Sequence, residues 1–478
     1  MQIAQPDAPI DSNTPYPAHL DYHRRSSQLD RNLDVKPHTL HPSTVLVLSF
    51  LAVILLGTGL LMLPLSHAKG EVAPFMTALF TSTSAVCVTG LVVVDTGTYW
   101  SGAGQVIIMG LFQLGGFGMM TAATLMGLLV SGSMRLRSQR LLQAETHSLA
   151  LGDVKSVAKL VLWVTLVTEL SMAVLLMLRF ALGYGMPWGE AAWQGLFHAV
   201  SAFNNAGFST WSDSVMRFVG DAAILVPLML AIIAGGLGFP VLHELLVERG
   251  RRRSIWSMHA VLTVWGSLAL IVVATLILFT AELNNPKTLG PLGLATKWLA
   301  ALFTSVSART AGFNAVDIGG LTSESLALHY ALMFIGGGSA GTAGGVKVTT
   351  FFILVLVVWN EIRGNPDVEF RGRRIAGPVQ RQALTVVALS SATIALAMLL
   401  ILPLTPLPYE KVLFEVISAF ATVGLSTGIT AELVPGAQLI LILMMFVGRV
   451  GVVTLAVAIA TNQHRRNYRY PEEKPIVG

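Results

Sequence analysis

Four short segments of the sequence share a pattern whose chemistry would be carried by the main chain. Each begins with Phe, has Ser-Ala four residues later, and then reaches a Gly followed by Leu or Phe. The segments are FTSTSAVCVTGLVVVD (80–95), FHAVSAFNNAGFST (197–210), FTSVSARTAGFNAVD (303–317) and FEVISAFATVGLST (414–427). Because glycine admits a positive φ, successive carbonyl groups in such a turn can point the same way. Rings of carbonyl oxygens can replace the hydration shell of a potassium ion.

The spacing of these turns indicates an internal repeat. Their glycines, Gly90, Gly207, Gly312 and Gly424, are separated by 117, 105 and 112 residues, and a fixed period is typical of repeated structural units. We expect the carbonyls that coordinate the ion on the three residues that end at each glycine. These are Val88, Thr89 and Gly90; Asn205, Ala206 and Gly207; Thr310, Ala311 and Gly312; and Thr422, Val423 and Gly424. Asn204 and Asn205 are expected to brace their turn by hydrogen bonds.

Enzyme and protein-ligated metal sites have little support. The single cysteine, Cys87, excludes an intramolecular disulfide and is expected to be a packing residue, and the 11 histidines show no HExxH spacing. Residues 337–341 match GxSxG, which with His329 would suggest an intramembrane serine hydrolase. That histidine lies ten residues from Ser339 with no acidic partner nearby, so no enzyme is expected. Residues 336–341 also match GxGxxG, but without a βαβ context.

The composition is that of a membrane protein. Hydrophobic residues make up 53% and charged residues 12% of the 478 residues, with a mean hydropathy of +0.67, whereas about 25% charged residues is usual in soluble domains. Uncharged stretches of 18 or more residues are candidate membrane spans. Eight such stretches occur, at 43–66, 104–131, 157–182, 221–246, 256–280, 326–358, 382–404 and 436–461. Shorter apolar segments, suited to re-entrant helices, lie between them at 74–86, 190–203, 295–308 and 409–420.

The placement of Lys and Arg sets the orientation. Of 31 such residues, 22 lie in the N-terminal tail, in 135–159, 249–253 and 363–381, and after residue 463. Cytoplasmic loops are enriched in both residue types, so both termini are expected in the cytoplasm and the protein is expected to be multi-pass in the inner (plasma) membrane. The polar residues 1–42 contain no apolar run that could act as a cleaved signal peptide.

The predicted fold is an all-α integral membrane protein with eight transmembrane helices and four re-entrant pore helices. Each repeat is a span, a short helix, a glycine turn and a second span, and two spans per repeat give all four repeats the same orientation. The turns would then meet around a central pore. The expected segments are a cytoplasmic tail (1–42), pore repeats 43–134, 135–248 and 249–362, and a fourth repeat with the C-terminal tail (363–478).

The expected direction of the four short helices favours binding of a cation at the turns. Short helices that descend from the outer face would aim their carbonyl ends at the axis, each with about −0.5 elementary charge. Asp95, Asp213 and Asp317 follow the turns and suggest an acidic outer mouth, although each could equally be an ordinary solvated loop carboxylate. Arg309 lies within the third turn and is expected to point behind it, because a guanidinium on the axis would repel the ion.

Several motifs resemble the Trk/Ktr/HKT superfamily of potassium uptake proteins. They are the four Ser-Ala glycine turns, GGGSAGTAGGVK (336–347), GRVG (448–451) and NYRYPEEKPIVG (467–478). The resemblance covers the chain after residue 43, leaves residues 1–42 outside, and is closest to the KtrB membrane subunits. It implies a potassium-selective subunit of an uptake system, a homodimer with one pore per protomer, and a cytosolic nucleotide-binding ring of the KtrA or TrkA type.

The same resemblance implies the ions and ligands. Potassium at the turn carbonyls is the transported ion, sodium is a candidate activator, and nucleotide is expected on the partner subunit. No covalent cofactor and no nucleic acid are expected, and lipids surround the protein. A glycine in the first turn, here Gly90, goes with potassium preference, whereas serine there in plant relatives goes with sodium.

The stretch 326–358 must contain a break, because one straight helix of that length would extend ~50 Å and overshoot the bilayer. Its glycine-rich part, 336–345, is expected to form a loop under the turns, and the resemblance implies that this loop is a gate. Arg449 is expected to donate to the loop or, alternatively, to reach the lipid headgroups; Lys347 either closes the loop or anchors its helix at the interface. The expected gate residues are Gly336, Gly337, Gly338, Ser339, Gly341, Thr342, Gly344, Gly345, Lys347 and Arg449.

A sodium- or proton-coupled secondary transporter is the main alternative. Such proteins usually place ionisable residues at mid-membrane. Glu169, in the third long stretch, is the acidic candidate. A single carboxylate rather than a pair favours a channel-like pore.

Overall fold

The computed structural model describes residues 42–138, 154–247, 256–452 and 454, and these are almost entirely helical. The described residues from Ser43 onward form one compact unit. The predicted polar tail as far as residue 41, part of the cytoplasmic connection 135–159, all of 249–253 and the C-terminal tail lie outside the described residues.

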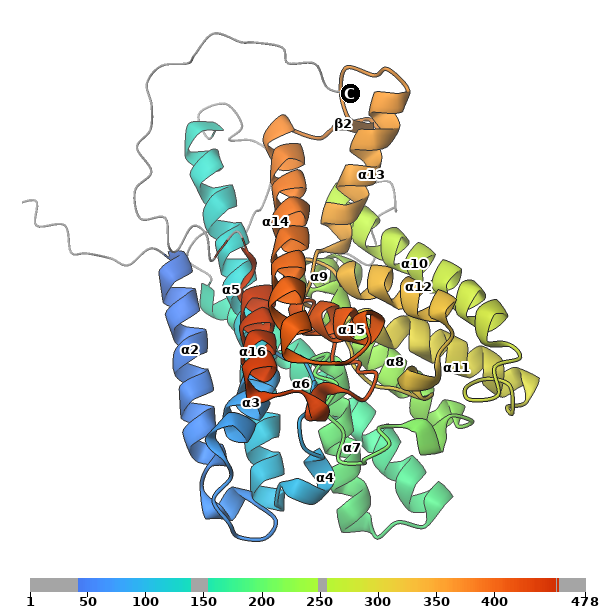
Figure 1. Cartoon of the computed structure of the whole chain (residues 1–478). Helices are drawn as coiled ribbons and strands as arrows, with labels where there is room; N and C mark the ends of the chain where they lie inside the picture. Colours follow the sequence, from blue (N-terminus) through green and yellow to red (C-terminus); the bar gives the residue numbers. More distant parts are fainter. Residues whose placement is uncertain (1–41, 139–153, 248–255, 453, 455–478) are drawn as a thin grey trace, which may run out of the picture. The chain divides into compact units, whose positions relative to one another are not determined.

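The first two repeats have the predicted order of a long helix, a short helix, a turn and a second long segment (Figure 1). The elements are α2 (Pro42–Leu61), η2 (Pro64–Ser66), α3 (Phe75–Val86), α4 (Thr96–Tyr99) and α5 (Gly102–Ser138), then α6 (Val154–Tyr184), α7 (Trp188–Phe203), η4 (Met216–Phe218), α8 (Ala222–Leu237) and α9 (Phe239–Val247). The short helices α3 and α7 begin within two residues of the starts of the predicted re-entrant segments 74–86 and 190–203.

The third and fourth repeats follow the same order. Their elements are α10 (Met258–Glu282), α11 (Leu294–Ser307), η6 (Ile318–Gly320), α12 (Ser323–Phe334) and α13 (Val348–Ile362), then α14 (Gly377–Ile401), η7 (Leu402–Leu404), α15 (Tyr409–Phe420), η8 (Thr430–Glu432) and α16 (Pro435–Val450). Between α13 and α14 a two-residue antiparallel pair, β1 (Glu369–Phe370) and β2 (Arg373–Arg374), forms a hairpin at the upper end of α13 in Figure 1.

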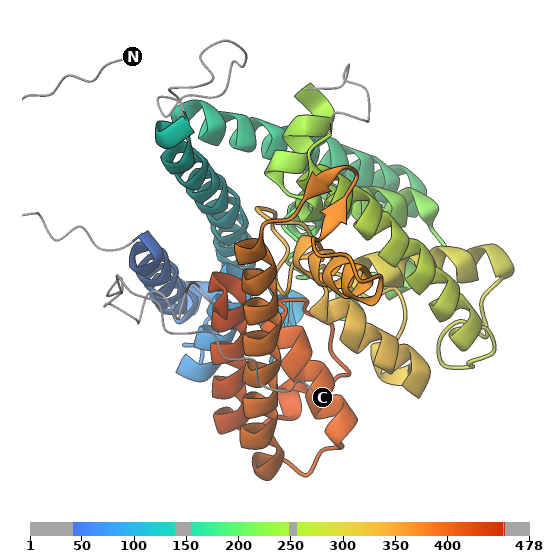
Figure 2. The same ribbon diagram turned by 90° about the horizontal axis from the view of Figure 1, so that it is seen from above.

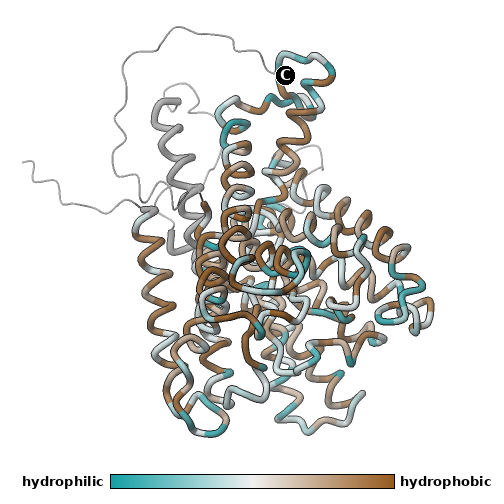
Figure 3. Tube along the Cα trace, viewed as in Figure 1, coloured by the Kyte–Doolittle hydropathy of each residue, from teal (hydrophilic) through white to brown (hydrophobic). Residues whose placement is uncertain are grey.

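Five helices in the described part of the chain are long and apolar enough to cross a membrane: α2, α5, α6, α10 and α14. Figure 3 shows the apolar residues running along these helices and the polar residues gathered at the connections. Large apolar side chains point outward, with Leu56 62% and Leu399 69% exposed. Water would not stabilise such surfaces, so the outward faces fit a lipid environment.

The second span of the second repeat, predicted at 221–246, is broken, because α8 and α9 meet at a bend of 106°. The second segments share a five-residue motif: LGGFG (114–118), AGGLG (234–238), IGGGS (335–339) and VGRVG (447–451). Helices α8 and α16 end just before the last glycine of their motif, and Gly238 and Gly451 have φ of +89° and +91°. The third segment opens into the predicted loop, and α5 alone continues through its motif.

The four repeats follow one another around a common centre when seen from above (Figure 2). Each repeat packs on the next through α5 and α6, α8 and α11, α12 and α15, and α16 and α3. Within a repeat, glycine allows the second segment to lie directly on its short helix: a Cβ on Gly115, Gly235 or Gly448 would overlap the carbonyl of Val86, Phe203 or Phe420, respectively. The backbone of each second segment therefore lies directly against the last turn of its short helix.

Gly238→Ala should destabilise the protein by about 1–3 kcal/mol, because the φ of +89° is strained for any residue with a Cβ and the new methyl would overlap the Ser339 carbonyl. The midpoint of thermal unfolding in detergent measures this. Gly110→Ala is the matched control, since its Cβ would meet nothing within 4 Å. Equal midpoints for the two variants would contradict the requirement for glycine at the bend between α8 and α9.

Candidate ion-binding site

The four predicted turns follow directly after α3, α7, α11 and α15 and share one backbone conformation. The residue two before each glycine has a positive φ: 58° at Val88, 57° at Asn205, 81° at Thr310 and 50° at Thr422. The glycines themselves have φ between 69° and 93°. Left-handed backbone at a non-glycine residue costs about 1–3 kcal/mol and persists only where the surroundings impose it. Its recurrence at four equivalent positions therefore shows that the same turn geometry is imposed on all four repeats.

The four glycines meet in a closed ring. A Cβ built on Gly90 would collide with the Ala206 carbonyl oxygen, and one on Gly207 would lie 2.9 Å from the Ala311 carbonyl oxygen. The same relation holds from Gly312 to Val423 and from Gly424 back to Thr89. Each turn thus touches the next through main-chain atoms, and no larger residue fits at these four positions.

A serine on each short helix braces the turn that follows it. Ser201 Oγ donates to the Phe208 carbonyl (2.8 Å), Ser307 Oγ to that of Phe313, and Ser418 Oγ to that of Leu425 (2.6 Å). In the first repeat Ser84 Oγ instead accepts from the Gly90 amide (3.1 Å). These are the serines of the Ser-Ala motif. The sequence marks them by their recurrence, but only the structure shows that they hold the turns.

The second turn has a further brace behind it. Asn204 Nδ2 donates to Glu169 Oε1 (3.0 Å) and to Gln113 Oε1, and Gln113 Nε2 donates to Glu169 Oε2 (3.1 Å). Glu169 is buried, with 3% of its surface exposed. The mid-membrane carboxylate is therefore engaged by two amides, and Asn204 has the bracing position expected for it.

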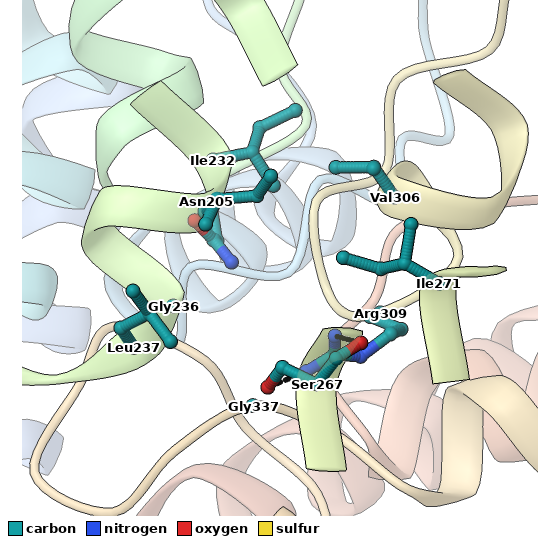
Figure 4. Close-up of a pocket in the computed structure, with 10 residues that line it drawn as sticks. Asn205, Ile232, Gly236, Leu237, Ser267, Ile271, Val306, Arg309 and Gly337 are labelled. Carbon is teal, nitrogen blue, oxygen red and sulfur yellow. Dashed lines mark hydrogen bonds between the residues drawn. The ribbon is translucent and has the colours of Figure 1, made fainter. Parts of the chain in front are cut away.

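Arg309 points to α10, away from the glycine ring. Its guanidinium donates to the Ser267 carbonyl (3.2 Å) and Ser267 Oγ (2.9 Å), and it reaches the Gly336 carbonyl at 3.5 Å. Figure 4 shows Arg309 and Ser267 side by side at a small cavity of about 20 Å³, with Asn205 on its far side. The arginine thus links the third turn to α10 and to the start of the glycine-rich loop.

The glycine-rich loop, 335–347, docks on the broken end of α8. A helix end leaves its last carbonyls without partners, and the break at Gly238 exposes those of Gly235 and Gly236. The loop satisfies both, through the Thr342 amide (3.2 Å) and the Gly338 amide (2.7 Å), and the Phe239 amide donates back to Ala340 (3.2 Å). The bend in repeat two and the loop in repeat three are thus one structural unit.

The loop also lies against the turns of repeats three and four, at the residues two before their glycines. A Cβ on Gly344 would collide with the Thr422 hydroxyl, and one on Gly336 would lie 3.3 Å from the Thr310 methyl. Thr342 Oγ1 donates to the Phe203 carbonyl at the end of α7 (3.3 Å). The loop therefore contacts three of the four repeats directly beneath the ring.

Arg449 connects this loop to the first repeat. Its guanidinium donates to the Thr342 carbonyl and, at 3.1 Å, to the Gly115 carbonyl of α5. It is 3% exposed, so the alternative in which it reaches the lipid headgroups is wrong. In the shared motif Arg449 stands where the other repeats have Gly116, Gly236 and Gly337. The fourth repeat thus carries a guanidinium side chain at a position where the other three have glycine.

Lys347 closes the loop rather than anchoring a helix, since Nζ donates to the Ala343 carbonyl at 2.6 Å. The three loop aspartates have local structural contacts. Asp95 and Asp317 cap α4 and η6, and Asp213 pairs with Arg217 at 2.7 Å. Partial burial would raise the pKa of the Asp213 carboxyl, but the Arg217 guanidinium outweighs it and the pKa is lowered. The interpretation as ordinary loop carboxylates therefore accounts for their observed contacts.

The sequence compares closely with known cation transport proteins. Residues 23–468 match the family model TrkH, described as cation transport protein. The chain is 38% identical to the Ktr system potassium uptake protein B of Bacillus subtilis (91% of this chain, 97% of the relative). It is 37% identical to the Vibrio alginolyticus protein of that name (91% and 94%) and 36% to the potassium/sodium uptake protein NtpJ of Enterococcus hirae (92% and 98%).

A solved structure supports the fold. The potassium transporter TrkH from Vibrio parahaemolyticus superposes with a TM-score of 0.69 at 19% identity, over 90% of this chain and 86% of that one. This agrees with the predicted all-α membrane fold. The family match begins at residue 23, so the expectation that all of residues 1–42 fall outside it is wrong; the basic part of the tail belongs to it. The chain belongs to the TrkH family of cation transport proteins, which are transporters and not enzymes.

Proposed function

We propose that the protein is the potassium-translocating membrane subunit of a Ktr-type uptake system, with the ring of four turns as its selectivity filter. The observation that carries this proposal is the closed contact of Gly90, Gly207, Gly312 and Gly424. Only carbonyl oxygens can line so narrow a ring, and they suit a dehydrated monovalent cation. The printed names of relatives at 36–38% identity support potassium as the ion and sodium as a second one.

The conduction path is channel-like in this proposal. The C-terminal ends of four short helices meet at the turns, and each contributes about −0.5 elementary charge. Glu169, the carboxylate that ion coupling would need, is engaged by Gln113 and Asn204, which favours a brace over a coupling site. The serine hydrolase alternative loses its support, since Ser339 Oγ contacts Thr349 Oγ1 (3.2 Å) and His329 Nδ1 contacts the Ser325 carbonyl (2.7 Å).

The gate in this proposal is the loop 335–347. In the described conformation it lies beneath the ring, tied to α8 by amides and to α5 through Arg449. Conduction then requires the loop to move away from Thr422 and Thr310. A cytosolic nucleotide-binding ring of the KtrA or TrkA type supplies this regulation, and a homodimer, plasma-membrane location and cytoplasmic termini complete the proposal. The words "Ktr system" in the relatives' names fit an assembly of several components.

Growth rescue tests the function itself. An uptake-deficient bacterium should grow at low potassium when it expresses this chain with a regulatory partner subunit, and more slowly with the chain alone. Purified protein in a planar bilayer should then show unitary currents. Slow saturable flux with a fixed sodium or proton stoichiometry would instead support the secondary transporter.

Gly90→Ser should lower the preference for potassium over sodium by about tenfold or more, because the added side chain strains a φ of +89° and displaces the Ala206 carbonyl. Initial rates of potassium and sodium uptake in proteoliposomes measure the ratio. Gly70→Ser is the matched control, since Gly70 has a similar φ of +72° with nothing within 4 Å. An unchanged ratio in Gly90→Ser would rule out this filter assignment.

Arg449→Ala should raise basal potassium flux several-fold in the absence of the partner subunit, because the loop loses its link to Gly115. Arg363→Ala, which removes an exposed guanidinium stacked on Trp359, serves as the control and should leave flux unchanged. Wild-type kinetics in Arg449→Ala would contradict the proposed link.

Deletion of residues 338–344 should also raise basal flux, because it removes the contacts with Gly235, Gly236 and Thr422. Rubidium uptake into cells that express equal amounts of protein measures this. Complete loss of uptake at normal expression would show that the loop is structural and not a gate.

A further inference from the structure

One position of the short helices differs in charge among the four repeats. It directly follows the first Phe of each repeated segment and is occupied by Thr81, His198, Thr304 and Glu415. Repeat four therefore carries a carboxylate where the other repeats have a hydroxyl or an imidazole. Glu415 is 1% exposed.

The Glu415 carboxylate lies immediately behind the fourth turn. Oε1 accepts from the Thr427 amide (2.9 Å) and from Ser426 Oγ (2.7 Å), and Oε2 accepts from Thr430 Oγ1 (2.8 Å). Among these partners, Ser426 stands two, Thr427 three and Thr430 six residues after Gly424. The carboxylate is thus held by donors on the segment through which the chain leaves the ring.

No cation of the protein balances this carboxylate in the described part of the chain. The ion pairs there join Arg179 to Asp221, Arg217 to Asp213 and Arg374 to Asp367. Burying an ionised carboxylate without a partner is costly, and hydrogen bonds alone offset only part of that cost. Glu169 and Glu282 are also buried and held by neutral donors, but of these three only Glu415 lies on a short helix that leads into a turn. At that place an ion in the ring would supply the positive charge.

The brace by itself does not need a carboxylate. In repeat two His198 Nε2 contacts Ser209 Oγ at 2.9 Å, and Ser209 stands two residues after Gly207, as Ser426 does after Gly424. The imidazole stacks on Trp211 with ring centroids 4.2 Å apart. Repeats two and four thus hold equivalent serines, one with an imidazole and the other with a carboxylate, so the carboxylate has a role beyond the brace.

We propose that Glu415 is a determinant of cation affinity: a fixed negative charge behind the fourth turn that attracts the transported ion to the ring and is balanced by it. This inference rests on the proposed function, since it assumes that the ring binds the ion. It assigns to repeat four a stronger attraction for the cation than to the other three. The geometry of the ring sets which ion fits, and the charge sets how tightly it is held.

The test is the potassium dependence of uptake by the full chain with its partner subunit in proteoliposomes. Glu415→Gln keeps the size of the side chain and removes the charge, so the KM for potassium should rise about tenfold, with a smaller change in kcat and an unchanged potassium-to-sodium ratio. Glu415→Asp keeps the charge and should stay within about threefold of the wild type. Glu415→His imitates repeat two and should match Glu415→Gln, which covers the case in which one variant folds poorly.

Glu282→Gln is the matched control. Glu282 is also 1% exposed and accepts from the Thr322 amide (2.9 Å) and from the Thr288 hydroxyl (2.5 Å), but it lies on α10 and not on a short helix before a turn. Its KM should equal that of the wild type. A wild-type KM in both Glu415→Gln and Glu415→His would overturn the inference, and so would equal losses in Glu415→Asp and Glu415→Gln.

These outcomes are separable from a failure of the proposed function. If the wild-type chain moves no potassium, or if Gly90→Ser leaves selectivity unchanged, the filter itself is wrong. If the wild type and Gly90→Ser behave as expected while the charge-removing variants of Glu415 keep a wild-type KM, only the role of Glu415 is wrong.

Discussion

Backbone carbonyl oxygens inside an apolar helical bundle need a hydrogen-bond donor or a cation as partner. The arrangement of the four turns at the centre of the molecule depends on this requirement. Water cannot serve within a lipid bilayer unless the backbone lines a cavity. Four turns meet through their glycines, and at each contact a carbonyl oxygen of one repeat faces the glycine of its neighbour. Oxygens grouped in this way are unfavourable next to each other and favourable around a cation. In the proposed function, a cation within the ring supplies the partner that these oxygens need.

The helices around the ring are adapted to bring backbones close together. Glycines in the second segments lie directly on the short helices of repeats one, two and four, and a serine from each short helix holds the turn after it. The strained residues of the turns, such as Thr310 with its φ of 81°, are imposed by these contacts. Rigidity at the ring therefore comes from packing of the surrounding repeats.

The four repeats share one plan but differ beneath the ring. The shared five-residue motif lets α5 continue in repeat one, bends repeat two at Gly238 and opens into a loop in repeat three, and in repeat four it carries Arg449 in place of its second glycine. The loop uses the carbonyls that the bend leaves free, and Arg449 takes one carbonyl from the loop and one from α5. A fourfold frame thus holds a single asymmetric element, and this is the element proposed as the gate.

The sequence by itself determined the repeated plan, the turns and the break in segment 326–358, because hydrophobic length and glycine spacing are local properties that recur every ~110 residues. It could not place the bend at Gly238, since a glycine within an apolar run is compatible with a straight helix, as Gly118 in α5 shows. Only the tertiary structure decided which carbonyl Arg449 binds, that Glu169 braces Asn204, and that Glu415 lies behind the fourth turn. Those contacts join residues from different helices or from both sides of a turn, and their partners depend on how the repeats pack around the centre.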